Sequence, residues 1–141
     1  MIRTLLVDDE FPSLKILENF SLKLAECEIV GKCTSGAEAL EFLQKNEVDL
    51  LFLDIQMPGM TGIEMLSKLE KRPITVITTA NHDKALDAYN LDVVDYLVKP
   101  FSFDRFHEKT NRIYEITIAT NQDGKVSKWT GVPNQTAPTL L

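Results

Sequence analysis

The stretch Leu50-Leu51-Phe52-Leu53 is an apolar run that ends in the carboxylate of Asp54. An apolar run followed at once by a charge is consistent with a buried strand that ends at the edge of a sheet. Other runs end in the same way, namely Leu5-Leu6-Val7 before Asp8-Asp9-Glu10, and 93–98 before Lys99-Pro100. This repeated pattern of a strand ending in charge decides both the fold and the candidate site.

Strand-like and helix-like segments alternate along residues 1–118. Apolar and β-branched runs predict strands at residues 2–7, 29–33, 50–53, 74–78 and 93–98. Apolar spacing and capping residues predict helices at about 11–25, 36–46, 62–71, 83–90 and 103–118. Such alternation with short loops is typical of a parallel sheet with helices on both faces. We therefore predict an α/β fold with a five-stranded, doubly wound parallel sheet of order 2-1-3-4-5.

Two of the predicted helices begin with the pattern of a capping box. Ser35 is followed three residues later by Glu38, and Thr61 by Glu64. In this pattern the hydroxyl accepts a backbone N–H of the first turn and the glutamate reaches back to the cap. Pro73 ends the helix that Thr61 begins.

The predicted strand order brings the charged strand ends together. Its switch point lies between the first and third strands, which end in Asp8, Asp9 and Asp54, and ligands bind there in open α/β sheets. Lys99 follows the fifth strand and reaches the same edge. We expect an acidic pocket with one cation, which binds a divalent metal and leaves a carboxylate free as a nucleophile.

Composition limits the class of protein. The 141 residues suffice for one domain, and the net charge of −6 argues against nucleic-acid binding by this chain itself. The apolar stretches are far shorter than a membrane span, and the N-terminus lacks a signal-peptide pattern, so we expect a cytoplasmic protein. We expect Cys27 and Cys33 to be reduced thiols, because a disulfide is less typical of that compartment.

The character of the sequence changes near its end. Residues 119–141 are rich in Asn, Gln, Thr, Gly and Pro and have few apolar positions. We predict one domain at residues 1–118 and a polar tail or linker at 119–141.

The motifs at the strand ends resemble those of response-regulator receiver domains, which have a flavodoxin-like fold. The resemblance covers residues 1–118 and rests on Asp8-Asp9-Glu10, Asp54 with Met57-Pro58-Gly59, Thr79-Ala80 and Lys99-Pro100-Phe101. The stretch from Ala88-Tyr89 to Arg105-Phe106 resembles, more narrowly, receivers of LytTR-type transcription regulators.

The resemblance implies a phosphoacceptor that is not an enzyme. Asp54 would take a phosphoryl group from a histidine kinase or a phosphotransfer protein, with Mg²⁺ as cofactor. Asp9 would be the more direct metal ligand, and the other ligands would be Asp8, Asp54 and the backbone carbonyl of Gln56. Lys99 and Thr79 would each contact a phosphoryl oxygen, and the Lys99-Pro100 peptide bond would be cis.

The resemblance also implies a switch from Thr79 to Tyr96 that changes the surface of residues 83–118. Charges of both signs on that surface suit a phosphorylation-dependent homodimer. The output would be transcription through a DNA-binding domain absent from this chain, with no direct nucleic-acid or membrane contact. Gln56 and Asn81 depart from the usual motif residues and flank the pocket mouth, so the lifetime of the phosphoryl group is open. His82 and His107 have no evident acid/base partner and are expected to be solvated or packing residues.

Other readings stay open at this point. A stand-alone receiver that acts by protein contacts would share every motif. A Mg²⁺-dependent phosphatase of the haloacid-dehalogenase type needs an aspartate at the position of Gln56. A flavodoxin-type flavin module needs a Ser/Thr/Gly-rich loop where Asp8-Asp9-Glu10-Phe11-Pro12 stands. A receiver that has lost phosphorylation would not be expected to retain all of the pocket residues.

Overall fold

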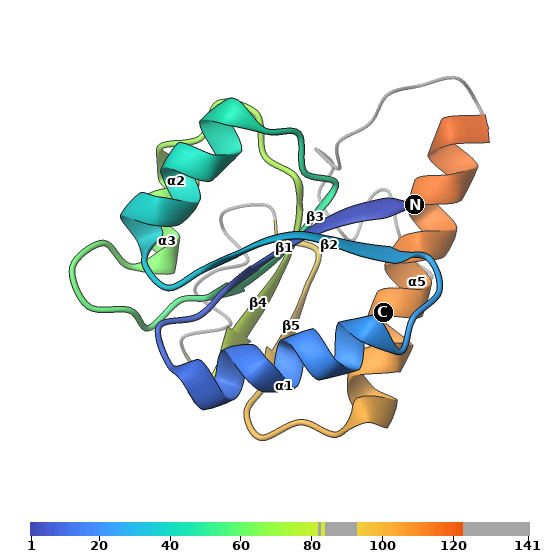
Figure 1. Ribbon diagram of the computed structural model, residues 1–141, viewed down its shortest axis with the longest axis horizontal. Coiled ribbons are helices and arrows are strands. Elements are labelled where there is room, and N and C mark those ends of the chain that lie inside the picture. The colour runs from blue at the N-terminus through green and yellow to red at the C-terminus, as the bar shows by residue number, and fades with distance from the viewer. Residues whose placement is uncertain (82, 84–92, 123–141) are drawn as a thin grey trace.

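The computed structural model describes residues 1–81, 83 and 93–122, with side chains as far as residue 115 (Figure 1). The strands are β1 (Ile2–Val7), β2 (Cys27–Cys33), β3 (Leu50–Asp54), β4 (Ile74–Thr79) and β5 (Asp95–Val98). The described helices are α1 (Phe11–Leu22), α2 (Gly36–Lys45), α3 (Gly62–Ser67) and α5 (Phe103–Gln122). All strands are parallel, in the order β2-β1-β3-β4-β5, which confirms the predicted fold class and topology.

The register of the sheet brings the strand ends to one edge. Val7 lies beside Leu53, and Thr79 lies beside Val98. The chain therefore leaves β1, β3, β4 and β5 at a common level. The residues that follow these strand ends are the charged and polar groups identified in the sequence.

The helices cover both faces of the sheet, α1 and α5 on one and α2 and α3 on the other (Figure 1). The α1/α5 face is rich in aromatic side chains, and Phe106 stacks on Phe52 of β3 at 5.2 Å between ring centroids. The opposite face is mostly aliphatic and includes the buried Met65 of α3. Both faces bury apolar side chains of the three inner strands, β1, β3 and β4, which form the centre of the core.

Several element ends differ from their predicted positions. Helix α1 ends at Leu22 and α3 at Ser67, because the next N–H groups turn back to carbonyls three residues earlier, as in Lys23 to Phe20 and Lys68 to Met65. Strand β2 begins earlier than predicted, at Cys27, since that residue pairs with Ile2. In addition, β4 ends one residue later than predicted, at Thr79, and β5 begins two residues later, at Asp95. Helix α5 extends beyond its predicted end at residue 118, to Gln122. Of the predicted helix at 83–90, all but its first residue lies outside the described residues.

The two predicted capping boxes have different outcomes. Thr61 and Glu64 form the complete reciprocal pair. Ser35 accepts the N–H of Glu38, but the Glu38 carboxylate accepts the N–H of Thr34 at 2.7 Å, one residue before the predicted donor. Cys27 and Cys33 are free thiols, as expected. None of the helices in the described part of the chain has the length and apolar character needed to cross a membrane.

Candidate functional site

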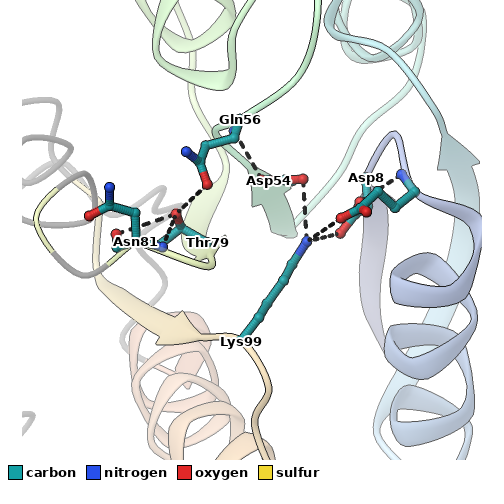
Figure 2. A network of polar contacts seen from close by, with 7 residues as sticks. Asp8, Asp54, Gln56, Thr79, Asn81 and Lys99 are labelled. Atoms are coloured by element: carbon teal, nitrogen blue, oxygen red, sulfur yellow. Dashed lines mark hydrogen bonds and ion pairs between the residues drawn. The ribbon is translucent and has the colours of Figure 1, made fainter.

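The carboxyl-terminal edge of the sheet carries two buried aspartates joined by one lysine (Figure 2). The ammonium of Lys99 donates to Asp8 Oδ2 at 2.7 Å and to Asp54 Oδ2 at 3.3 Å. Its distance to the exposed carboxylate of Glu10 is 3.9 Å. Asp8 is fully buried and Asp54 is 3% exposed. The predicted meeting of strands β1, β3 and β5 at a charged pocket is therefore present.

The two aspartates are held by the same local device. Asp54 Oδ1 accepts the N–H of Gln56 at 2.9 Å, and Asp8 Oδ1 accepts the N–H of Glu10 at 2.9 Å. A short polar side chain often bonds its own backbone two residues further on. In each case the other carboxylate oxygen is left to face Lys99 (Figure 2). Local turn geometry thus aims both acids into the pocket.

Burial and charge change the acid–base properties of these groups. Burial raises the pKa of Asp54 to about 6, although the Gln56 N–H and the charge of Lys99 pull it down. Burial lowers the pKa of Lys99, but the hydrogen bond to Asp8 and the charge of Asp54 outweigh it, so that pKa is raised. Lys99 is therefore cationic at neutral pH, and it is the only cation paired with Asp8 and Asp54 among the described residues.

The donor set of the pocket suits a hard divalent cation. Oxygens of Asp8, Glu10 and Asp54 lie within 4.8 Å of one another. Asp9 Oδ1 is buried and has no hydrogen-bond partner among the described residues. Such an orphaned carboxylate oxygen is costly unless a cation or water satisfies it. Carboxylate oxygens at this spacing fit Mg²⁺, which binds through a few carboxylates and keeps several waters.

Glu10 is the residue that sequence reasoning missed. The sequence places it directly after Asp8 and Asp9, and the turn that bonds its N–H to Asp8 brings its carboxylate toward the pocket. Asp9 was predicted as the more direct ligand, but it does not belong to the group of close oxygens. Its role stays a prediction.

Thr79 forms a second polar network beside the acids (Figure 2). Its buried hydroxyl lies 3.3 Å from Gln56 Oε1 and 3.4 Å from the carbonyl oxygen of Asn81. The same hydroxyl accepts the N–H of Asn81 at 3.0 Å. Thus Gln56 and Asn81, which flank the pocket in the sequence prediction, both contact Thr79.

The wall formed by residues 55–61 is fixed by two close backbone approaches. A Cβ atom on Gly62 would lie 2.8 Å from the carbonyl oxygen of Asp54, and one on Gly36 would lie 2.8 Å from that of Met60. Contacts this short leave no room for a methyl group, so both positions require glycine. Helices α2 and α3 therefore abut the loop directly after Asp54.

Tyr96 lies on β5 and is half-buried. The ammonium of Lys109 lies 5.7 Å from the centre of its ring and pairs with Asp95 at 2.8 Å. The Lys99-Pro100 peptide bond is cis in the structure. Residues 84–92 of the predicted switch surface lie outside the described residues, and so does His82, which precedes that surface. His107 stacks on Phe103 of α5 at 5.6 Å between ring centroids, consistent with a packing role.

The family model "Response regulator receiver domain" matches residues 4–111. This chain belongs to the response regulator receiver domain family. The resemblance found in the motifs is therefore confirmed over most of the chain.

Two relatives illustrate the family. The chain is 38% identical over 115 residues to "Transcriptional regulatory protein BtsR" of Escherichia coli, covering 80% of this chain and 48% of BtsR. It is 38% identical over 108 residues to "Sensory transduction protein LytT" of Bacillus anthracis, covering 74% and 44% respectively. The chain thus spans about half the length of the curated relatives that it matches. The LytT match supports the narrower, LytTR-type resemblance.

Solved structures agree with the fold. The response regulatory domain of MrkE from Klebsiella pneumoniae has a TM-score of 0.73 and 32% identity, covering 86% of this chain and 99% of that domain. The response regulator TrrA of Thermotoga maritima, solved in complex with Mg²⁺ and BeF, has a TM-score of 0.68 and 32% identity, covering 80% and 99%. Receiver domains bind Mg²⁺ at an acidic pocket, and this chain has such a cluster.

Proposed function

We propose that Asp54 is the phosphoacceptor of this receiver domain and takes the phosphoryl group of a phosphohistidine on a histidine kinase or phosphotransfer protein. The observation that carries this proposal is the placement of the Asp54 carboxylate. It is buried at the end of β3, and one of its oxygens faces a cation in an acidic pocket. A carboxylate is a competent nucleophile for an aspartyl phosphate.

The step is a displacement at phosphorus. The Oδ2 atom of Asp54 forms the new P–O bond while the P–N bond to the donor histidine breaks, and the imidazole leaves with the bonding electrons. The other oxygen, Oδ1, stays bonded to the Gln56 N–H, which orients the carboxylate. Phosphoryl transfer requires mainly positioning and neutralisation of charge.

Several groups in the pocket would share the task of neutralising the negative charge on the phosphoryl oxygens. Asp9, Asp8, Asp54 and the carbonyl of Gln56 would hold Mg²⁺, which supplies positive charge beside the phosphoryl oxygens when bound. Lys99 already lies 3.3 Å from the attacking oxygen, and its ammonium can follow the charge to a phosphoryl oxygen. The Thr79 hydroxyl can donate to a further oxygen. The protein thus acts as a phosphoacceptor rather than as an enzyme with turnover on a free substrate.

A shallow, mostly apolar groove beside the pocket suits the approach of the donor. It lies between α1 and the segment after β5, and its lining includes Ile16, Leu17 and Phe101. Asp8 and Lys99 form the end of this groove that meets the acidic pocket. A partner helix seated there would present its phosphohistidine to Asp54.

The relatives support a transcriptional output. Since BtsR is a transcriptional regulator about twice as long as the matched segment, we assign residues 1–118 to the receiver and 119–141 to a linker toward a DNA-binding domain. In the cytoplasm, phosphorylation would act through Thr79 and Tyr96 to favour a homodimer. A stand-alone receiver remains the second candidate, because the site itself is the same in both.

The test is an intact-mass measurement after incubation with acetyl phosphate, with and without Mg²⁺. We expect a single Mg²⁺-dependent phosphoryl adduct that Asp54→Asn abolishes. Asp49→Asn is the matched control, because Asp49 lies before β3, at the opposite end of the strand, and should leave the adduct unchanged. An adduct that survives Asp54→Asn would refute the assignment, and the absence of any adduct would indicate a receiver without phosphorylation.

A further inference from the structure

The hydroxyl of Thr79 is already occupied in the resting structure. A threonine hydroxyl has a single proton to donate. Two oxygens compete for it here, Gln56 Oε1 at 3.3 Å and the Asn81 carbonyl at 3.4 Å. Figure 2 shows Asn81 on the side of Thr79 that faces away from Asp8 and Lys99, and Gln56 between Thr79 and Asp54. The proton that a phosphoryl group on Asp54 would need is therefore directed elsewhere.

Gln56 connects this hydroxyl to the phosphoacceptor. Its backbone N–H donates to Asp54 Oδ1 at 2.9 Å, while its side-chain carbonyl reaches Thr79. Gln56 thus contacts both Asp54, the proposed phosphoacceptor, and Thr79 at the end of β4 (Figure 2).

We propose that Gln56 is a latch, a positioning residue that holds the Thr79 hydroxyl in its resting orientation and must release it when Asp54 is phosphorylated. This proposal rests on the phosphoacceptor function proposed above. A charged phosphoryl oxygen is a stronger acceptor than a neutral amide carbonyl. The Thr79 hydroxyl therefore turns and donates its hydrogen bond to the phosphoryl oxygen instead of to Gln56. Gln56 is exposed, and water can replace the bond that its carbonyl loses. The latch therefore opposes activation only weakly and opens reversibly.

The consequence is that the latch sets how readily the pocket accepts a phosphoryl group. Gln56→Met keeps the length of the side chain and removes the acceptor. In that variant the Thr79 hydroxyl no longer has to break a bond with Gln56. We expect the variant to bind beryllofluoride, a phosphoryl analogue, about threefold more tightly at saturating Mg²⁺, as measured by calorimetry, which is the size expected for one exposed hydrogen bond.

A double-mutant cycle with Thr79→Ala separates this mechanism from a direct effect of Gln56 on the ligand. Without the hydroxyl, Gln56→Met should leave the beryllofluoride affinity unchanged. A second cycle measures urea unfolding in the absence of Mg²⁺ and beryllofluoride. There the pair should stabilise the resting fold, so Gln56→Met should destabilise it when Thr79 is present and not when Thr79 is replaced by alanine.

The outcomes are distinct. Tighter binding that depends on Thr79, together with a stabilising coupling in the resting protein, supports the latch. An equal effect of Gln56→Met with and without Thr79, unchanged or weaker binding, or a resting coupling of zero overturns it while the phosphoacceptor function stands. Wild-type protein that binds no beryllofluoride with Mg²⁺ overturns the phosphoacceptor function and the latch together.

Discussion

The two edges of the sheet carry the same kinds of charged groups in opposite surroundings. At the amino-terminal edge, Arg3 pairs with Glu47 at 3.0 Å and Asp49 at 3.5 Å, and the Glu47 side chain is 81% exposed. At the carboxyl-terminal edge, Lys99 pairs with Asp8 and Asp54, and the Lys99 side chain is only 16% exposed. At each edge one cation lies between two acids, and the exposed Glu10 is a third, more distant partner of Lys99 at 3.9 Å. Solvent exposure of the pairs is therefore the main difference between the edges.

This difference indicates which edge has a function. Exposed ion pairs contribute little to stability, since water screens them and solvates each partner alone. Buried acids in excess of their cations are costly, and a fold tolerates them chiefly where they bind something charged. The amino-terminal edge therefore fits a structural role, whereas the carboxyl-terminal edge has the buried acids and the cation that the proposed metal and phosphoryl site requires.

The largest expected contrast comes from removing the cation at each edge. Lys99→Met leaves the buried Asp8 and Asp54 without a neighbouring cation, and it should destabilise the metal-free protein by about 3 kcal/mol. Arg3→Met should cost about 1 kcal/mol or less. Urea unfolding at neutral pH measures both. Mg²⁺ should restore much of the stability lost in Lys99→Met and none of that lost in Arg3→Met; equal losses at the two edges would contradict the comparison.

The next effect concerns pH and Asp54. Its pKa of about 6 lies above that of an unfolded aspartate, so the folded protein holds a proton that the unfolded chain releases. The stability that the folded protein gains from holding this proton is fully present below about pH 4 and is lost as the pH rises through about 6. Asp54→Asn does not titrate. In Mg²⁺-free buffer, the free energy of unfolding of the variant relative to that of the wild type should rise by about 1 to 3 kcal/mol between pH 4 and pH 7, as measured by urea unfolding. A difference that does not change with pH would show that the buried carboxylate titrates normally.

The smallest effect concerns Asp9. If its orphaned oxygen is a Mg²⁺ ligand, Asp9→Asn should weaken Mg²⁺ binding by about tenfold, equivalent to about 1.4 kcal/mol. Glu47→Gln removes a carboxylate at the other edge and should leave the affinity unchanged. Calorimetric titration with MgCl₂ measures both. An unchanged affinity in Asp9→Asn would remove this residue from the ligand set and favour Glu10 in its place.

Sequence patterns were sufficient for the architecture and for the position of the site. The apolar runs before Asp8, Asp54 and Lys99 predicted the strands, and strand order alone brought these residues to one edge. Sequence patterns predicted the ends of helices less well, because local hydrogen bonds decide where a helix ends. The ends of α1 and α3 depend on a choice between carbonyls three or four residues back, which composition does not encode.

The finer geometry of the site was also beyond the sequence. The approach of Glu10 to the pocket and the bond between Gln56 and Thr79 depend on how two loops meet in space. The predicted dimer surface and the linker stay predictions, because residues 84–92 and 123–141 lie outside the described part of the chain.

The glycines at positions 36 and 62 have a consequence for how the pocket transmits a signal. Because no methyl group fits between them and the carbonyls of Met60 and Asp54, the loop after β3 rests directly on helix backbones at both ends. Backbone contacts yield less than side chains, so this loop serves as a rigid frame of reference. If phosphorylation displaces the Thr79 side chain, as proposed, this loop would stay fixed, and the displacement would be passed to the other contacts of Thr79.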